Sequence, residues 1–270
     1  MRVSGLFIYP VKSLKGISLE VSEVGFKGLK WDRRWMLVDQ NNRFLSQREF
    51  PVLAKLKTEI SDNYLKISVE KKNKSIKIKI GEFPVEKITV TVWDDKLEAL
   101  VYGSDINDWF KEILGMEVRL VFQPEDSIRA IDGKYAVTGE EETSMSDGYP
   151  ILIIGEKSLE FLNSKCPEKI DLERFRPNIL FEGGEAHIED NFKSFQIGSV
   201  KLYGVKPCAR CVITTINPVT LEKGKEPLAT LSTYRKVGNK ILFGQNVVVH
   251  KTGEIRVGDI LVINNVVITN

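Results

Sequence analysis

Hydrophobic and polar residues alternate with a period of two over much of the first hundred residues. In the segment Ser-Ile-Lys-Ile-Lys-Ile at 75–80, isoleucines occupy every second position and lysines lie between them. This alternation predicts a strand with one buried and one solvated face. Comparable runs, rich in β-branched residues, lie at 5–9, 17–21, 35–39, 64–70 and 87–92. The N-terminal part is therefore predicted to consist of short strands separated by turns.

The period changes to that of a helix at residues 104–115. The apolar residues that recur there at helical spacing are Ile106, Trp109, Phe110, Ile113 and Leu114. Ser104 or Asp105 is a candidate N-cap, and Gly115 suits the C-terminal end. We therefore predict one amphipathic helix at the end of the N-terminal half.

Beyond this helix the pattern is again mostly that of strands. Residues 118–122 predict a strand, and the polar, acidic segment 139–148 predicts a loop that joins two halves. The later predicted elements are strands at 151–155, 179–183, 200–205, 246–251 and 259–269, a helix at 156–165 and a hairpin-like turn at 251–254. Because strands and helices do not alternate regularly, we predict a β-rich α+β fold with barrel-like sheets. The predicted domains are 1–123 and 124–270.

Composition and charge narrow the classes of function. The 270 residues are 42% hydrophobic and 28% charged, and the net charge is +2, so neither nucleic acid nor an anionic membrane is an expected partner. The lysine-rich segment 71–74 is predicted to be a turn. The N-terminus is a poor signal peptide, and no apolar run has the length of a membrane span. Three cysteines are few for a disulfide framework, so we expect a cytoplasmic protein with free thiols.

The residues Cys208-Ala209-Arg210-Cys211 are the main candidate for chemistry. A structural zinc site requires four ligands, and the remaining candidates are only Cys166, His187 and His250. A thioredoxin-like redox pair begins a helix, whereas the β-branched residues 212–216 predict that this pair opens a strand.

Two further interpretations of the cysteine pair remain. The cysteines are simply small buried apolar residues, or they are reactive thiols. Lys206 and Arg210 favour the second interpretation, because cations beside a thiol favour the thiolate, which is the form that binds soft metals. The residues of the pair alone leave zinc, redox, structural and metal-thiolate interpretations open.

The segments around the cysteines resemble the MOSC domain family, in particular its branch with the mitochondrial amidoxime-reducing component and bacterial relatives. The similar segments, in order along the chain, are YPVKSLKG (9–16), DRRWMLVD (32–39), SDGYPILIIGEKSLEFLN (146–163), RFRPNILFEG (174–183), KPCARCVITTINPVT (206–220), KEPLATLSTYR (225–235), LFGQN (242–246) and GEIRVGDIL (253–261). This resemblance covers both halves. It implies an N-terminal β domain over 1–123, followed by a distorted MOSC β-barrel over 124–270.

The resemblance also implies a cofactor, molybdenum-molybdopterin (Mo-MPT). By position, Cys211 supplies the protein thiolate to the metal, and Cys208 is a structural neighbour. The predicted cofactor-binding residues are Lys12, Ser13, Arg33, Asp147, Gly148, Arg176, Asn178, Ala209, Arg210 and Cys211. A phosphate dianion requires cations, and a pterin requires amide-type or carboxylate partners.

Individual roles follow from the same resemblance. Lys12 and Ser13 meet the phosphate end, Arg33 is a cofactor contact, and Arg176 and Asn178 surround the pterin. Asp147, which precedes Gly148, accepts from pterin N–H groups. Ala209 and Arg210 place donors near the metal.

Some residues near these positions receive other predictions. Asp147 is also a candidate for relaying protons, and it is named with Cys211 as catalytic. The adjacent Arg34 is expected at the surface. The tryptophans Trp31, Trp35 and Trp93 are expected in the core or between domains. His187 and His250 are expected to be surface or hydrogen-bonded histidines.

The implied function is reduction of small N-hydroxylated compounds at the molybdenum centre. Three cysteines are too few for a fused iron–sulfur domain, so the electron donor is expected to be a separate ferredoxin-like protein or reductase. An alternative is a non-catalytic carrier of molybdenum cofactor or sulfur, and a third is a zinc or redox CxxC protein. We find no dinucleotide-binding, phosphate-loop or hydrolase motif that competes.

Overall fold

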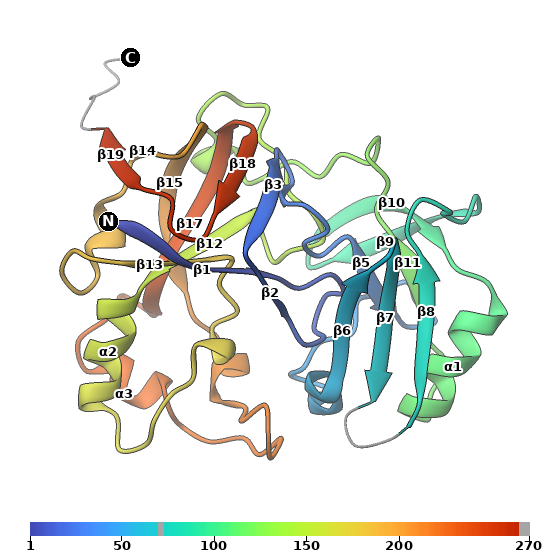
Figure 1. Cartoon of the computed structure of the whole chain (residues 1–270). Helices are drawn as coiled ribbons and strands as arrows, with labels where there is room; N and C mark the ends of the chain where they lie inside the picture. The colour runs from blue at the N-terminus through green and yellow to red at the C-terminus, as the bar shows by residue number, and fades with distance from the viewer. Residues whose placement is uncertain (70–72, 265–270) are drawn as a thin grey trace.

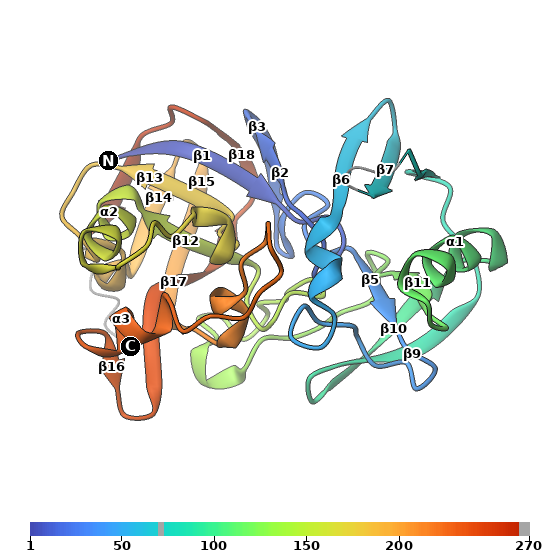
Figure 2. The same ribbon diagram turned by 90° about the horizontal axis from the view of Figure 1, so that it is seen from below.

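The computed structural model describes residues 1–69 and 73–264, which form two β-rich halves lying side by side (Figure 1). Helix α1 (Ser104–Leu114) lies at the outer edge of one half, while α2 (Glu156–Lys165) and α3 (Leu228–Ser232) lie together in the other (Figure 2). The predicted β-rich α+β class is confirmed. Within the described ranges, no helix has the length and apolar character needed to span a membrane.

The N-terminal half contains two antiparallel sheets, with the orders β5-β11-β10-β9 and β6-β7-β8. Their bounds are β5 (Trp35–Val38), β6 (Leu56–Ser61), β7 (Tyr64–Val69), β8 (Ser75–Lys79), β9 (Lys87–Val92), β10 (Asp95–Val101) and β11 (Arg119–Phe122). The alternation in β8 gives the expected faces, since Ile78 is buried while Lys77 and Lys79 are exposed. Between the two sheets and α1 lies a core that includes Trp35 and Phe110.

The second half is a large sheet with the order β19-β14-β15-β17-β12-β13-β1-β2, and β16 pairs with β17. The bounds are β1 (Arg2–Ile8), β2 (Ile17–Leu19), β12 (Ile151–Gly155), β13 (Ile179–Glu182), β14 (Ser194–Ile197), β15 (Val200–Ala209), β16 (Lys236–Val237), β17 (Lys240–Lys251) and β19 (Leu261–Asn264). Phe181, Phe192 and Phe195 are fully buried in its core. Helix α2 packs on β12 and β13 through the buried Leu162.

The first strands of the chain pair with strands of the second half. β1 is antiparallel to β13, and β3 (Val21–Gly25) pairs with β18 (Gly253–Arg256) and β4 (Gly28–Leu29). The chain therefore starts in the second half's sheet and crosses to the other half before returning. The domain boundary after residue 123 stays a prediction.

Short 3-10 helices connect several of these strands. Their bounds are η1 (Pro51–Lys55), η2 (Gly133–Tyr135), η3 (Leu172–Arg174), η4 (Ile188–Asn191) and η5 (Val212–Thr215). The strand predicted after the cysteine pair was wrong, because residues 212–215 form η5 and the pair lies at the end of β15. The β-branched residues there pack as a helical turn, since tertiary contacts override local propensity.

Other local predictions had mixed outcomes. Gly115 is the left-handed C-cap of α1 as expected, but the N-cap is Gly103, without a side-chain cap. The turn at 251–254 does not join a hairpin, because β17 and β18 lie in different sheets. Helix α2 begins at Glu156. Parts of the predicted turn at 71–74 and of the strands at 64–70 and 259–269 lie outside the described residues.

His187 differs from both expectations, since its side chain is neither exposed nor hydrogen-bonded within the described residues. Both ring nitrogens are buried there without a partner, and the ring lies against Phe161, Tyr234 and Phe243. Burial, together with the nearby positive charge of Arg235, lowers the pKa of His187 to about 4 from its ordinary value of 6.5. The neutral ring is therefore the form that the fold accepts.

We expect the free energy of unfolding to decrease as the pH falls from about 6.5 to about 4. In this window the unfolded chain binds a proton at His187, while the folded protein does not. The variant His187→Asn, whose side chain tolerates the positive φ of this position, is expected to flatten that decrease. Urea unfolding at several pH values measures the slope, and His250→Asn at the exposed histidine is the control. An unchanged slope in His187→Asn contradicts the assignment.

Candidate functional site

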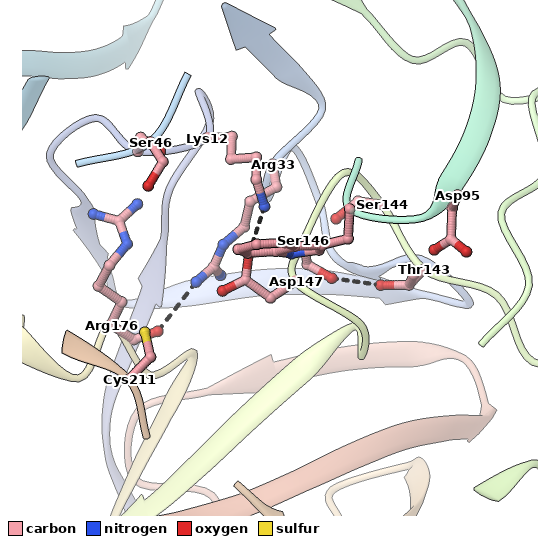
Figure 3. A network of polar contacts seen from close by, with 12 residues as sticks. Lys12, Arg33, Ser46, Asp95, Thr143, Ser144, Ser146, Asp147, Arg176 and Cys211 are labelled. Atoms are coloured by element: carbon pink, nitrogen blue, oxygen red, sulfur yellow. Dashed lines mark hydrogen bonds and ion pairs between the residues drawn. The ribbon is translucent and has the colours of Figure 1, made fainter. Parts of the chain in front are cut away.

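The ten residues predicted to bind a cofactor all line one cavity of about 520 Å³ between the halves. Figure 3 shows Lys12 and Arg33 from the N-terminal part, Asp147 from the central loop, and Arg176 and Cys211 from the second half. These side chains point toward a common space. Their roles in binding stay a prediction, but the structure brings the whole predicted set together.

Arg33 is held by a buried carboxylate. Its Nη1 donates to Asp32 Oδ2 at 2.6 Å, and the other oxygen of Asp32 accepts the backbone N–H of Tyr9 at 2.7 Å. Asp32 is completely buried. Arg33 Nη2 also donates to the carbonyl of Arg176 at 3.1 Å, so one side chain joins the two halves. A buried charge of this kind is tolerated because it is paired and hydrogen-bonded.

Arg176 lies beside Arg33, and both guanidinium groups contact the ring of Tyr9. Their central carbons are 4.1 and 4.3 Å from the ring centroid. Arg176 Nη1 donates to the carbonyl of Leu14 at 2.7 Å, whereas Nη2 is buried and has no partner among the residues that the structure describes. Burial and the neighbouring charge of Arg33 lower the pKa of Arg176 to about 10. Of these two adjacent guanidinium groups, Arg33 alone is paired with Asp32, so an anion beside Arg176 would be favourable.

Asn178 is almost fully buried and acts within the protein. Its side-chain oxygen accepts from Leu152 N at 3.1 Å and from Arg33 Nη1 at 3.3 Å. Its amide nitrogen donates to the carbonyl of Phe7 at 3.2 Å. Asn178 therefore orients Arg33, and its predicted contact with a pterin stays a prediction.

Lys12 and Asp147 form an ion pair at the cavity wall. Lys12 Nζ donates to Asp147 Oδ1 at 2.7 Å; the lysine is buried, while the carboxylate is exposed to the cavity. Burial lowers the pKa of Lys12, although Asp147 opposes that shift. Burial raises the pKa of Asp147, but the charge of Lys12 and its hydrogen bond outweigh burial and hold that pKa well below its ordinary value. Asp147 is therefore ionised at neutral pH and acts as an acceptor.

The loop that carries Asp147 is fixed by Arg129, a residue that the sequence analysis missed. Arg129 is buried and pairs with Asp95 at 2.7 Å. Its Nη1 donates to the carbonyls of Ser144 and Ser146 at 3.0 and 2.6 Å. Thr143 and Ser146 share a further hydrogen bond of 2.6 Å (Figure 3). The loop is thus held from inside, and Asp147 and Gly148 are presented to the cavity.

Three of the predicted site residues have an unusual backbone. Ser13, Arg33 and Arg176 adopt φ values of 71°, 50° and 54°, in the left-handed region. Each such position costs about 1–3 kcal/mol unless neighbouring contacts compensate. Ser13 is held by a hydrogen bond from its Oγ to the carbonyl of Leu45 at 3.0 Å. All three residues lie in turns or irregular segments between strands and line the cavity.

The cysteine pair lies where β15 ends and η5 begins. Cys211 is the N-cap of η5, and its carbonyl accepts from Thr214 N and Oγ1. Its sulfur accepts a hydrogen bond from Arg48 Nη2 at 3.2 Å. All three cysteines are free. Cys211 therefore presents a single thiol to the cavity, next to a cation.

Arg210 contacts the other cysteine of the pair. Its Nη1 donates to Cys208 Sγ at 3.1 Å, and its Nη2 donates to the carbonyl of Phe175 at 2.7 Å. Arg210 Nε is buried and has no partner in the part of the chain that the structure describes. Ala209, between the cysteines, also lines the cavity.

Two expectations about neighbouring residues were wrong. Arg34 is buried rather than at the surface, because it donates twice to the carbonyl of Gln123 and pairs with Glu125 at 2.6 Å. Trp93 is 37% exposed and lines the cavity, whereas Trp35 is buried in the core as predicted. Trp31 packs against both cores, between the halves.

Unpaired donors around the cavity show what kind of group it accepts. Arg48 Nε, Arg176 Nη2 and Arg210 Nε are buried and find no acceptor within residues 1–69 and 73–264. Among the described residues, none of these three arginines is paired with a carboxylate within 4.0 Å. Buried donors without partners are costly, so the cavity suits a ligand that brings negative charge and acceptor atoms.

Known families match the chain over both halves. The model of the MOSC N-terminal beta barrel domain matches residues 1–117, and that of the MOSC domain matches residues 140–262. Mitochondrial amidoxime-reducing component 1 of Mus musculus is 32% identical over 274 residues, covering 95% of this chain and 80% of that protein. The chain belongs to the MOSC family.

Further relatives of this MOSC protein carry two kinds of name. Mitochondrial amidoxime-reducing component 1 of Homo sapiens is 32% identical and covers 95% of the chain and 81% of that protein. Molybdenum cofactor sulfurase of Oryza sativa subsp. japonica is 30% identical and covers 90% of the chain, which spans 32% of the sulfurase. Among solved structures, the YUAD protein from Bacillus subtilis aligns over 96% of the chain with a TM-score of 0.44 and 10% identity. That level of similarity is too low to bear on function.

We expect a phosphate monoester to stabilise the cofactor-free MOSC protein through the unpaired guanidinium groups. At a concentration ten times Kd, the gain is roughly 1.4 kcal/mol. The variant Arg176→Met is expected to lose most of this gain, because it removes a buried cation with a free N–H group. Thermal unfolding with and without the ester measures the effect, and Arg2→Met at an exposed arginine is the control. Equal stabilisation of the wild type and Arg176→Met contradicts the assignment.

Proposed function

We propose that the protein is a molybdenum-cofactor-dependent reductase of N-hydroxylated compounds, with Cys211 as the thiolate ligand of the metal. The cavity carries this proposal: the Cys211 thiol, which accepts from Arg48, lies on its wall near buried guanidinium groups whose N–H donors find no acceptor among the described residues. A phosphate-bearing pterin supplies the missing acceptors, and a soft, high-valent metal suits a thiolate. The residues present therefore fit Mo-MPT. The relatives named amidoxime-reducing components support the substrate class.

The protein's own contribution is to bind and orient the cofactor. Lys12 would hold the phosphate end, Arg33 would contact the cofactor, and Arg176 would lie beside the pterin, since their side chains point into the same cavity. Arg210 would donate from its unpaired Nε. Asp147, which is ionised beside Lys12, would accept from pterin N–H groups. As a proton relay, Asp147 would have to take up a proton before giving one.

Bound molybdenum supplies the two-electron chemistry that reduces the N–O bond of the substrate. The chain confines the reacting groups between its two halves, and Trp93 and Phe44 form an aromatic part of the wall that limits access of water. The electrons come from a separate donor, a ferredoxin-like protein or a reductase.

The second candidate function is a carrier that holds molybdenum cofactor or sulfur and transfers it. The 30% identity with molybdenum cofactor sulfurases favours this alternative. It also uses Cys211, but without reductase turnover. The zinc alternative gains no support, because no cluster of three or more His, Cys, Asp or Glu side chains suited to a metal lies within the described residues.

The decisive experiment compares wild type, Cys211→Ser and Cys208→Ser, produced in a host that makes molybdenum cofactor. We expect about one molybdenum per chain in wild type and in Cys208→Ser, because one thiolate holds the metal. Cys211→Ser is expected to lose molybdenum or to change its electronic spectrum. Plasma mass spectrometry and visible absorption measure both properties.

The same three proteins are then assayed with an aromatic amidoxime and a reduced viologen as electron donor. Reduction to the amidine by wild type and Cys208→Ser, with loss of activity in Cys211→Ser, supports the reductase. Molybdenum without turnover, or a persulfide on Cys211, supports the carrier. A wild-type protein without molybdenum contradicts the reductase, and one with neither molybdenum nor a persulfide on Cys211 contradicts both functions.

A further inference from the structure

Arg48 contacts the proposed metal ligand from the opposite half of the protein. It lies in the turn before η1, and its Nη2 donates to Cys211 Sγ at 3.2 Å across 163 residues of sequence. Neither the sequence motifs nor the family resemblance singled out this residue. Its Nε is buried and has no partner among the residues described. Within the described chain, this arginine has no carboxylate within ion-pair distance, so the cysteine sulfur is its side chain's hydrogen-bond acceptor.

Trp93 holds the guanidinium group of Arg48 in place. The central carbon of Arg48 lies 4.5 Å from the centroid of the Trp93 ring, a cation–π contact. The tryptophan is itself held by two contacts. Its Nε1 donates to Asp147 Oδ1 at 3.3 Å, and its ring forms an edge contact with the ring of Phe44, with 4.9 Å between the ring centroids. Its φ of 58° places it in the left-handed region at the tip between β9 and β10. A strained, exposed tryptophan persists where its contacts compensate for the strain.

The backbone of Arg48 is anchored on both sides of the cavity. Its N–H donates to Ser46 Oγ at 3.0 Å within its own turn. Its carbonyl accepts from Lys223 Nζ at 3.1 Å, in the loop that follows η5. Because Cys211 begins η5, this second contact ties the Arg48 turn to the cysteine segment. The arginine is therefore placed by its main chain as well as by its side chain.

We propose that Arg48 is a positioning residue for Cys211: stacked on Trp93, it keeps the sulfur directed into the cavity and places a fixed positive charge beside it. The role of the sulfur as a metal ligand rests on the function proposed above, but the contact itself does not. A residue that hydrogen-bonds to a metal ligand without binding the metal itself orients that ligand and changes its electronic surroundings. Lysine is an incomplete substitute, since it lacks the planar group that stacks on the ring.

The charge is tested on the full-length, cofactor-free protein by alkylating Cys211 with iodoacetate and with iodoacetamide. Both reagents attack the thiolate, so the ratio of the two rates does not depend on the thiolate fraction. The ratio reports the local field, which favours the anionic reagent when Arg48 is present. Removing a unit charge about 4 Å away in water is expected to lower the ratio about fivefold in Arg48→Met at low salt.

The chain offers two controls for this measurement. Trypsin cleaves after Arg210, so Cys208 and Cys211 fall on different peptides, and the ratio at Cys208 is an internal reference. Arg43→Met removes an exposed arginine five residues away, which pairs with Glu49, and is expected to leave the ratio at Cys211 unchanged. Circular dichroism establishes that each variant is folded.

Two more variants separate position from charge. Arg48→Lys keeps a cation, so its ratio of the iodoacetate rate to the iodoacetamide rate at Cys211 is expected to stay close to that of the wild type. Trp93→Leu keeps the arginine but removes the ring beneath it, and its ratio is expected to fall toward that of Arg48→Met. An unchanged ratio in Arg48→Met, or an equal fall at Cys208, overturns the assigned charge. A wild-type ratio in Trp93→Leu overturns the positioning by stacking.

The molybdenum-loaded protein provides an independent readout. Loss of an outer partner typically weakens metal binding 10- to 100-fold, so Arg48→Met is expected to release molybdenum at least about tenfold faster than wild type. Arg48→Lys is expected to be intermediate. Equal release from all three proteins contradicts the proposal. If the wild type holds no molybdenum, the proposed function fails, while the alkylation ratio still decides the role of Arg48.

Discussion

The buried ion pair between Asp32 and Arg33 is the interaction on which the rest of the site depends. Asp32 binds the backbone of Tyr9 at the end of β1, and Arg33 reaches the carbonyl of Arg176 and the amide oxygen of Asn178. The pair therefore joins the start of the chain to the second half's sheet. Without Asp32, Arg33 would be a buried cation beside Arg176, an arrangement that the fold does not tolerate without a counter-charge.

Asp32 and Asp147 each pair with one cation near the cavity, but among the described residues no carboxylate pairs with Arg176 or Arg210. Arg176 and Arg210 keep buried N–H groups without acceptors, and burial lowers the pKa of Arg176. Such groups reduce the stability of the free protein, since each N–H loses its hydrogen bond to water. Their concentration at one cavity, beside a thiol and strained backbone, is typical of a binding site whose ligand supplies the missing partners.

Much of this structure was predictable from the sequence, and the reasons are physical. The alternation in 75–80 and the helical spacing in 104–115 depend only on residues close in sequence, and both elements formed as predicted. The ten residues predicted to bind a cofactor also line one cavity, and they could be named because they lie in segments that resemble a known family. By contrast, residues 212–215 became a 3-10 helix because hydrogen bonds at Cys211 and packing outweighed β-branched propensity.

Long-range contacts account for what the sequence did not reveal. Arg48 and Arg129 carry no local signal, since their partners lie 163 and 34 residues away or are backbone carbonyls. Trp93 was expected in the core or between domains because tryptophan is largely apolar, yet its place at the tip between β9 and β10 brings it to the cavity wall. Burial of Arg34 likewise follows from carbonyls that only the folded chain provides.

The central claim is that Cys211 binds molybdenum in this cavity, and X-ray absorption at the molybdenum edge tests it most directly. The measurement counts the sulfur atoms bound to the metal in the loaded wild type and in Cys211→Ala. The account predicts one sulfur ligand fewer in the variant than in the wild type, because only the thiolate of Cys211 is removed. The same sulfur count in both proteins would show that Cys211 is not a ligand.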